Sequence, residues 1–291
     1  MKLGGHCVLF GPAIAQDTEG TLGKLAFAGA EGCEIGERFF GTEGKETLVA
    51  ALNEMHIELA GMHCNGLNLP DLLDDPEKSR QALLKTARLV ADMPNKNIIA
   101  TGATGDSLEV ISARRICDGA VSPELHCAEN ARTIARNLNT IARELREEYG
   151  VTIHYHNHSW EFADNGLLWF AIADEAPDVC FALDTGWAAV SGFDPCELLT
   201  AYAGRFHYVH LRDYTAFENA GERLFSDVHQ GFVTLGTGAM NYPRLMRCLE
   251  RVLGREDWAI VEYEKGNFDQ NSYLRAISYL RGIRDVLESG D

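Results

Sequence analysis

Eight short apolar runs, separated by segments of helical character, constrain the fold of this chain more than any other feature. The runs occupy residues 2–8, 32–36, 57–64, 97–102, 151–157, 179–185, 207–213 and 259–264. Strands that alternate with helices pair in parallel through crossover helices. Eight such units, with no segment left over for a second domain, predict a single α/β domain over residues 1–291, a (β/α)8 TIM barrel.

The segments between the runs carry the apolar periodicity of amphipathic helices. In the longest of them, residues 128–149, apolar side chains recur three or four positions apart, and Gly150 favours the end of the helix. These apolar residues are Ile134, Leu138, Ile141 and Leu145. Residues 76–93 and 272–290 are predicted to be helical as well.

The overall charge limits the partners of the chain. A net charge of −17 argues against a protein that grips nucleic acid by its phosphates or binds a membrane surface through basic residues. No run is long and apolar enough for a signal peptide or a transmembrane helix. The eight cysteines form no C-x-x-C pair and are expected to be reduced thiols, mostly buried, which predicts a cytoplasmic protein.

Titratable side chains gather at the carboxyl-terminal ends of the predicted strands, where this fold builds its active sites. They are Glu34, Glu37, His63, His154, His156, His158, Asp184, His210, Asp213, Glu262 and Glu264. Each alone could be an ordinary hydrogen-bonded or solvated residue, which is how we interpret His6, His56, His126, His207 and His229. Together they predict a metal or catalytic site, and mixed nitrogen and oxygen donors suit Mn²⁺, Zn²⁺, Co²⁺ or Fe²⁺ better than Ca²⁺.

Five motifs, in order, carry a resemblance to a known family: "YHNHSWEF", "LDTGW", "YVHLRD", "LGTG" and "IVEYE". The ordered set resembles the sugar phosphate isomerase/epimerase superfamily, the xylose isomerase-like barrels. The resemblance implies one divalent metal ion, most often Mn²⁺, with Zn²⁺, Co²⁺, Fe²⁺ or Mg²⁺ as alternatives. Carried over motif by motif, its ligands are Asp184, His210 and Glu262.

The first metal ligand is where this chain departs from the ketose epimerases, which place a glutamate on the fifth strand. Here that strand carries histidines, and the first carboxylate after it is Glu161. We therefore predict Glu161 as the replacement ligand, with His156 or His158 as the next candidate. The departure makes the chain more similar to the dehydratase and keto-glycoside branch of the superfamily.

The resemblance implies a sugar isomerase or epimerase that acts on a ketose or keto-polyol through a metal-stabilised enediolate. The alternative is a metal-dependent dehydratase or lyase of the inosose dehydratase or 3-keto-glycoside type. In either reaction a base removes a proton next to a carbonyl, and Glu262, His156 and His158 are the candidates. One of the two histidines could also protonate a leaving hydroxyl.

The predicted partner is a small sugar or cyclic polyol, and a homo-oligomer is compatible with the family. The predicted substrate contacts are His63, Glu37, Trp187 and Arg212. Two other classes of protein fit less well. A DNA-repair endonuclease of this fold needs three Zn²⁺ ions and a basic face, and a non-enzymatic scaffold leaves Asp184, His210 and Glu262 without a role.

Overall fold

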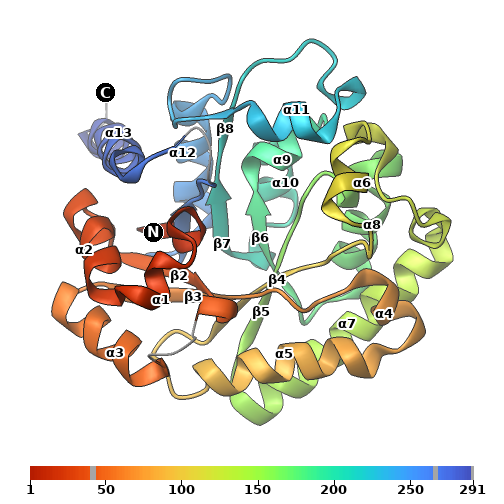
Figure 1. Ribbon diagram of the computed structural model, residues 1–291. Coiled ribbons are helices and arrows are strands. Elements are labelled where there is room, and N and C mark those ends of the chain that lie inside the picture. The colour runs from red at the N-terminus through yellow and green to blue at the C-terminus, as the bar shows by residue number, and fades with distance from the viewer. Residues whose placement is uncertain (40–43, 265–267, 290–291) are drawn as a thin grey trace.

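A computed structural model describes residues 1–39, 44–264 and 268–289 of the chain (Figure 1). Eight parallel strands close into a barrel in the order β1–β10–β7–β6–β5–β4–β3–β2, which confirms the predicted TIM barrel. The barrel strands are β1 (Lys2–His6), β2 (Gly32–Gly36), β3 (Glu58–Cys64), β4 (Asn97–Thr101), β5 (Thr152–His156), β6 (Cys180–Asp184), β7 (Phe206–Leu211) and β10 (Trp258–Val261).

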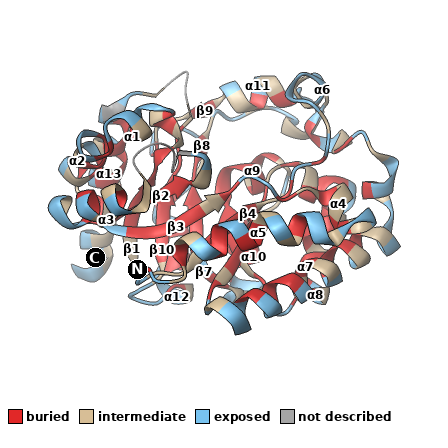
Figure 2. Cartoon of the chain, turned by 60° about the horizontal axis from the view of Figure 1, so that its bottom comes forward, coloured by how far each residue is buried: buried red, intermediate tan, exposed pale blue. Residues whose placement is uncertain are grey.

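Helices surround the barrel, and buried residues concentrate on the strands and on the helix faces that cover them (Figure 2). The longer helices are α2 (Thr18–Ala28), α3 (Gly44–Met55), α5 (Pro76–Val90), α7 (Ala128–Tyr149), α8 (Ala163–Glu175), α10 (Pro195–Ala201), α12 (Tyr242–Val252) and α13 (Gln270–Ser289). Shorter ones are α1 (Ala13–Gln16), α4 (Leu69–Asp74), α6 (Leu108–Ser112), α9 (Thr185–Val190) and α11 (Phe225–Gln230). The last helix, α13, packs beside α2, next to the N-terminus (Figure 1).

The predicted helices agree with the structure to within three residues at each described end. Helix α13 begins at Gln270, two residues before its predicted start, and its predicted end at residue 290 lies outside the described residues. The stripe on α7 is buried as expected, and the helix ends at Tyr149 with Gly150 in the left-handed conformation. Helix α5, predicted to reach residue 93, ends at Val90. Pro94 explains part of this difference, because a proline disfavours helical backbone at the residue before it.

Two glycines make room for large side chains inside the barrel. A Cβ atom on Gly32 would lie 2.5 Å from the ring of Trp258, and one on Gly4 would lie 2.6 Å from Ile260 Cδ1. Trp258 and Ile260 belong to a buried cluster with Ala60, Ile99, Ala182 and Tyr208. Interior positions of a barrel strand recur at every second residue. This apolar layer therefore lies next to the polar side chains at the carboxyl-terminal ends of the strands.

The pairing of β2 with β3 slips by one residue immediately before the site. Cys33 is opposite Leu59, but Glu34 is opposite Gly61, so Ala60 is an extra residue on β3. Such irregularities redirect side chains and are common beside active sites. Here the slip lies directly before Glu34, the first polar side chain of β2 to enter the barrel mouth.

A short antiparallel pair, β8 (Asp213–Tyr214) with β9 (Phe232–Val233), extends beyond the barrel and was not predicted. Asp213 ties the "LGTG" loop to it, because its carboxylate accepts backbone N–H groups of Gly236, Gly238 and Met240 at 2.9 Å each. Asp213 is therefore a loop anchor. Across the described ranges, no helix has the length and apolar character needed to cross a membrane.

Candidate active site

A cavity of about 330 Å³ opens at the carboxyl-terminal ends of the strands. Four histidines and two glutamates line it, namely His6, His63, His156, His158, Glu262 and Glu264. Trp160, which stacks on His158 with ring centroids 4.3 Å apart, forms part of the wall. The cavity is large enough for a small polyol and is rich in groups that transfer protons or bind metals.

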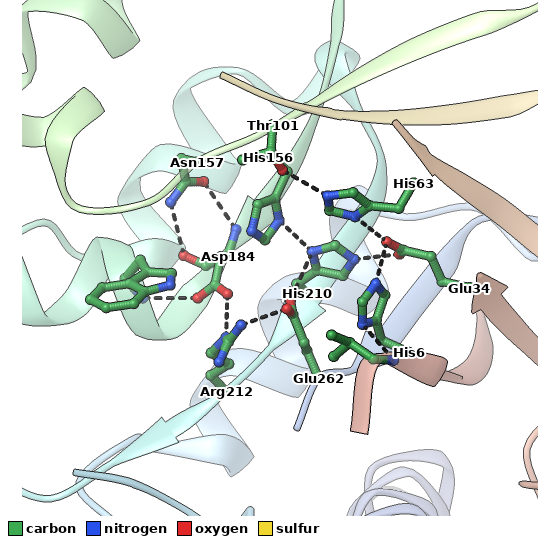
Figure 3. A network of polar contacts seen from close by, with 12 residues as sticks. His6, Glu34, His63, Thr101, His156, Asn157, Asp184, His210, Arg212 and Glu262 are labelled. Carbon is green, nitrogen blue, oxygen red and sulfur yellow. Dashed lines mark hydrogen bonds and ion pairs between the residues drawn. The ribbon is translucent and has the colours of Figure 1, made fainter. Parts of the chain in front are cut away.

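Three buried side chains at this end of the barrel could hold one metal ion. His156 from β5, His210 from β7 and Glu262, directly after β10, each offer one ligand atom, and these atoms lie within 4.8 Å of one another. The Nδ1 atoms of His156 and His210 are 2.5 Å apart, and His210 Nδ1 is 3.3 Å from Glu262 Oε2 (Figure 3). Two imidazole lone pairs this close would repel, so a proton shared by the two nitrogens, or a cation bound beside both, would stabilise the arrangement.

The buried carboxylate of Glu34 determines which nitrogen of His210 carries a proton and which one is free to face His156 and Glu262. His210 Nε2 lies 2.6 Å from Glu34 Oε2, and an ionised carboxylate only accepts hydrogen bonds, so Nε2 donates its proton to Glu34. In the neutral ring the lone pair is then on Nδ1, toward His156 and Glu262. Carboxylates that fix histidine tautomers in this way are a regular feature of metal sites.

Glu34 collects further donors around the same carboxylate (Figure 3). His63 Nδ1 lies 2.8 Å from Oε1, and the Tyr208 hydroxyl donates to Oε2 at 2.8 Å. Burial opposes ionisation of Glu34, but the facing imidazoles of His210 and His6 outweigh it and hold the pKa well below its usual range. His6, Glu34 and His63 also lie close enough to form a metal-binding group.

We interpret His6, Glu34 and His63 as supporting residues instead of a second metal site. Nδ1 of His6 accepts the backbone N–H of Val8 at 3.3 Å, so Nε2 carries the proton of the neutral ring and cannot bind a metal. His63 is held on both sides, since its Nε2 lies 3.0 Å from the hydroxyl of Thr101. These contacts turn both rings toward Glu34.

Arg212 lies buried between the carboxylates of β6 and β10. Its guanidinium contacts Asp184 Oδ2 at 2.6 Å, Glu262 Oε1 at 2.5 Å and Glu264 Oε1 at 2.8 Å. The other oxygen of Asp184 accepts the backbone N–H of Trp187 at 2.8 Å. Asp184, a predicted metal ligand, is thus held by Arg212 and is not in the group of His156, His210 and Glu262.

Several buried atoms at the site lack a hydrogen-bond partner, which tests whether the residues fit a metal ion. Among the described residues, His158 Nδ1 has none, and Glu262 Oε2 has only the 3.3 Å contact with His210 Nδ1, although both residues line the cavity. Buried polar atoms are rarely left without a partner, so such atoms point to a missing ligand. An imidazole pair with a free carboxylate oxygen matches the donors that Mn²⁺, Fe²⁺, Co²⁺ and Zn²⁺ accept.

The structure separates Glu161, predicted as the first ligand, from this group. One of its oxygens accepts the hydroxyl of Tyr155 at 2.8 Å, and the other accepts the backbone N–H of His158 at 2.7 Å. Burial raises the pKa of Glu161 to about 7, and these two donors oppose the shift. Glu161 therefore shapes the turn after β5, whereas His156, the next candidate in the sequence, lies beside His210.

Of the four predicted substrate contacts, one lines the cavity and three do not. His63 lines the cavity, but Glu37, Trp187 and Arg212 do not reach it in the described part of the chain. Glu37 contacts the Thr86 hydroxyl at 2.5 Å and Lys85 Nζ at 3.6 Å. Trp187 is fully buried and stacks on Phe225 with centroids 4.8 Å apart.

Sequence reasoning underestimated two residues. His6, interpreted as an ordinary histidine, lines the cavity, and Glu34 is the centre of the hydrogen-bond network. His6 was missed because the first apolar run was predicted to extend to residue 8, whereas β1 ends at His6, as β5 ends at His156. For Glu34, position at a strand end suggested the site, but the convergence of three imidazoles on it depends on distances across the barrel.

Comparisons with known proteins agree with this architecture. Residues 22–283 match the family described as "Xylose isomerase-like TIM barrel". The chain belongs to this family. An inosose dehydratase of Clostridium beijerinckii is 25% identical over 276 residues, which cover 92% of this chain and 89% of that protein.

Solved structures show the same fold at lower sequence identity. A sugar phosphate isomerase/epimerase from Parabacteroides distasonis superposes with a TM-score of 0.71 at 18% identity, over 96% of this chain and 93% of that one. The 3-keto-D-glucoside 4-epimerase of E. coli gives a TM-score of 0.68 at 14% identity, over 97% and 99%. Enzymes named dehydratase and epimerase thus share this barrel.

Proposed function

We propose that the chain is a divalent-metal-dependent lyase that removes water from a cyclic keto-polyol of the inosose type. The observation that carries this proposal is the asymmetric environment of Glu262. Arg212 binds Oε1, whereas Oε2 is buried beside the imidazole pair, 3.3 Å from His210 Nδ1, and makes no hydrogen bond within the described residues. The similarity to inosose dehydratases over nearly the whole chain favours dehydration over isomerisation.

The cation in this proposal is held by His156, His210 and Glu262, with Mn²⁺ as the first choice. When bound, it would supply Lewis-acid polarisation of the substrate carbonyl, which makes the neighbouring C–H more acidic. Glu34 contributes by keeping the proton of His210 on Nε2. Arg212 contributes by fixing the orientation of the Glu262 carboxylate.

Proton transfer is assigned to the carboxylate of Glu262. Burial alone would raise the pKa of Glu262, but Arg212 and His210 lower it, so the carboxylate is ionised and can accept a proton. It takes the proton from the carbon next to the ketone and delivers it to the hydroxyl on the following carbon. The C–O bond breaks, a C=C bond forms, and the proton and hydroxyl leave as water.

His158 is assigned to substrate binding and not to proton transfer. Burial, assisted by Arg212, lowers the pKa of His158 to about 3, so its imidazole is neutral. A pKa this low makes the ring a weak base, and the neutral ring is a poor acid for a leaving hydroxyl. Its Nδ1 atom, which has no hydrogen-bond partner among the described residues, is free to bond a substrate hydroxyl, so the donor role that the dehydratase interpretation of the sequence suggested is not part of this proposal.

A second candidate is epimerisation or isomerisation of a ketose or keto-glycoside, the first choice from the sequence. It begins with the same proton removal, so the residues around Glu262 serve both reactions. The fate of the β-hydroxyl distinguishes the two reactions. Cytoplasmic location and a homo-oligomeric state stay predictions of the sequence.

The test is incubation of the Mn²⁺-loaded chain with an inosose in D₂O. Dehydration predicts an absorbing unsaturated product and one equivalent of water lost, as followed by ultraviolet absorbance and mass spectrometry. Glu262→Gln should abolish the product while leaving the fold intact by circular dichroism. Deuterium incorporation without loss of water would support the epimerase instead, and no reaction at all with keto-polyols or ketoses would contradict both.

A further inference from the structure

A second and larger cavity, of about 660 Å³, lies between α10 and α12 on the outside of the barrel. It shares no lining residue with the candidate active site within the described ranges. Two cysteines, Cys196 of α10 and Cys248 of α12, line it, and the Cys248 sulfur contacts the backbone carbonyl oxygen of Cys196. A role for this cavity is independent of the proposed function, because none of its lining residues takes part in the dehydration.

The two cysteines form a connected polar group. All eight cysteines lie in the described ranges and carry free thiols. Cys248 Sγ lies 3.6 Å from the carbonyl oxygen of Cys196 and 3.8 Å from the hydroxyl of Thr200. Each residue is only 9% exposed, yet both line the cavity, so a molecule must enter it to reach the sulfur atoms.

Basic side chains of α12 surround the same cavity. Arg244, Arg247 and Arg251 are spaced three and four residues apart, which places them along one side of the helix. Arg244 is paired with Asp194 at 2.7 Å. Within the part of the chain that the structure describes, Arg247 and Arg251 form no ion pair, and Glu197 is the one carboxylate that lines the cavity.

This basic surface is unusual for a chain with a net charge of −17. Two uncompensated guanidinium groups beside a cavity attract anions, particularly carboxylates, which they can bind through two hydrogen bonds. The same charges favour the thiolate form of a nearby cysteine. Cavity, thiols and arginines therefore occur together on one short stretch of surface.

The two thiols are not equivalent. A hydrogen bond from the Cys196 thiol, with help from the Thr200 hydroxyl, Arg244 and Arg251, lowers the pKa of Cys248 to about 6, although burial opposes the shift. The same hydrogen bond, with burial and the nearby Asp194, raises the pKa of Cys196. Cys248 is also the cysteine on the arginine-bearing helix, with Arg244 and Arg251 four and three residues away, so we take it as the nucleophile of the pair.

We propose that Cys248 is a modification site that forms mixed disulfides with small disulfides carrying carboxylate groups. The Cys248 thiolate attacks one sulfur of the disulfide and forms a new S–S bond, while the original S–S bond breaks. The other half leaves as a thiolate, so the incoming disulfide is the only oxidant required. Arg247 and Arg251 bind the carboxylates and bring the reagent to the sulfur.

The test compares two disulfides on the full-length chain. One is the dianionic aromatic disulfide 5,5′-dithiobis(2-nitrobenzoate), and the other is cystamine, which is cationic. The rate at each cysteine is followed by mass spectrometry of peptides, with exposed Cys127 as the internal reference. The two reagents release thiols of different pKa, so their intrinsic rates differ. Preference is therefore defined as the ratio of the anionic to the cationic rate at a cysteine divided by the same ratio at Cys127, and the negative charge of the chain acts on both cysteines.

We expect the ratio at Cys248 to favour the anionic reagent by about tenfold over the ratio at Cys127 at low salt. The preference should disappear in the double variant Arg247→Gln, Arg251→Gln and persist in Arg143→Gln, which removes an exposed arginine of α7. Cys248→Ser should remove the fast anionic reaction altogether. Preference for cystamine at Cys248, or a fast phase carried by another cysteine, would overturn the proposal.

Discussion

Glu34 and His210 are joined by a 2.6 Å hydrogen bond that crosses the interior of the barrel, because β2 and β7 are not neighbouring strands. The bond places one proton on Nε2 of His210 and turns the Nδ1 lone pair toward His156 and Glu262. Glu34 on β2 thus orients a ligand of the candidate metal site, whose residues come from β5, β7 and the end of β10. Metal affinity should therefore depend on Glu34 although Glu34 is not a ligand.

The first prediction concerns this dependence. Glu34→Gln keeps the size of the side chain but removes the negative charge, so the His210 tautomer is no longer fixed. We expect Mn²⁺ affinity to fall roughly 10- to 100-fold, measured by isothermal titration calorimetry. Tyr208→Phe removes one donor to Glu34 and keeps its charge, so it should cost much less. Equal affinity in wild type and Glu34→Gln would contradict the supporting role.

The second prediction concerns Arg212. Its replacement by methionine leaves the carboxylates of Asp184, Glu262 and Glu264 close together without their cation. We expect the free energy of unfolding to fall by about 3–5 kcal/mol, measured by urea denaturation without metal. The control is Arg244→Met, which breaks the more exposed pair with Asp194 and should cost at most about 1 kcal/mol. Similar losses in both variants would show that the buried network is not essential.

The third prediction separates Glu161 from the metal ligands. Glu161→Gln still accepts a hydrogen bond through its amide oxygen, so it should retain bound Mn²⁺ close to the wild-type amount. If Glu161 is a ligand, as the sequence suggested, the bound metal should be lost. Tyr155→Phe is the matched control, because it removes the hydroxyl that contacts Glu161 Oε1 and leaves the carboxylate in place. Metal content by mass spectrometry decides between the two outcomes.

The fourth prediction is a pH dependence of the metal-free chain. Burial alone would lower the pKa of His210, but the carboxylates of Glu34, Glu262 and Asp184 raise it to about 9. A folded-state pKa above the unfolded value stabilises the fold fully below about pH 6.5, and this contribution is lost as the pH rises through 9. Wild type should therefore exceed His210→Gln in stability at pH 6, by up to about 3 kcal/mol.

That advantage should shrink between pH 6.5 and 9 when both proteins are unfolded with urea in the presence of a chelator. On the acid side, the lowered pKa of Glu34 supports the fold above the ordinary glutamate pKa, and this support is lost as the pH falls. An advantage of wild type that grows from pH 6.5 to 9 would show that His210 is not a buried cation in the metal-free state.

The strands were predictable because each is a short apolar run closed by polar residues, and the barrel followed from their number and alternation. The site was predictable to the level of which strand ends contribute, since parallel strands bring those ends to one rim. Thus His156, His210 and Glu262 were named from the sequence as candidates, and the structure places their ligand atoms within 4.8 Å of one another.

The pairing among these residues could not be predicted from the sequence. Whether Asp184 faces the cation or Arg212 depends on where a long side chain from the next strand lies. Whether Glu161 reaches the site depends on the turn after β5, which directs it to Tyr155 and the His158 backbone. Both questions concern ångström-scale distances that no spacing in the chain encodes.

The metal content of purified wild type, beside His210→Ala and Glu262→Gln, decides whether these side chains hold a cation. Each protein is incubated with Mn²⁺, dialysed and analysed by mass spectrometry. We expect about one ion per chain in wild type and loss of the ion in both variants, with native circular dichroism throughout. Wild type that retains no metal, or variants that retain as much as wild type, would contradict a cation held by His156, His210 and Glu262.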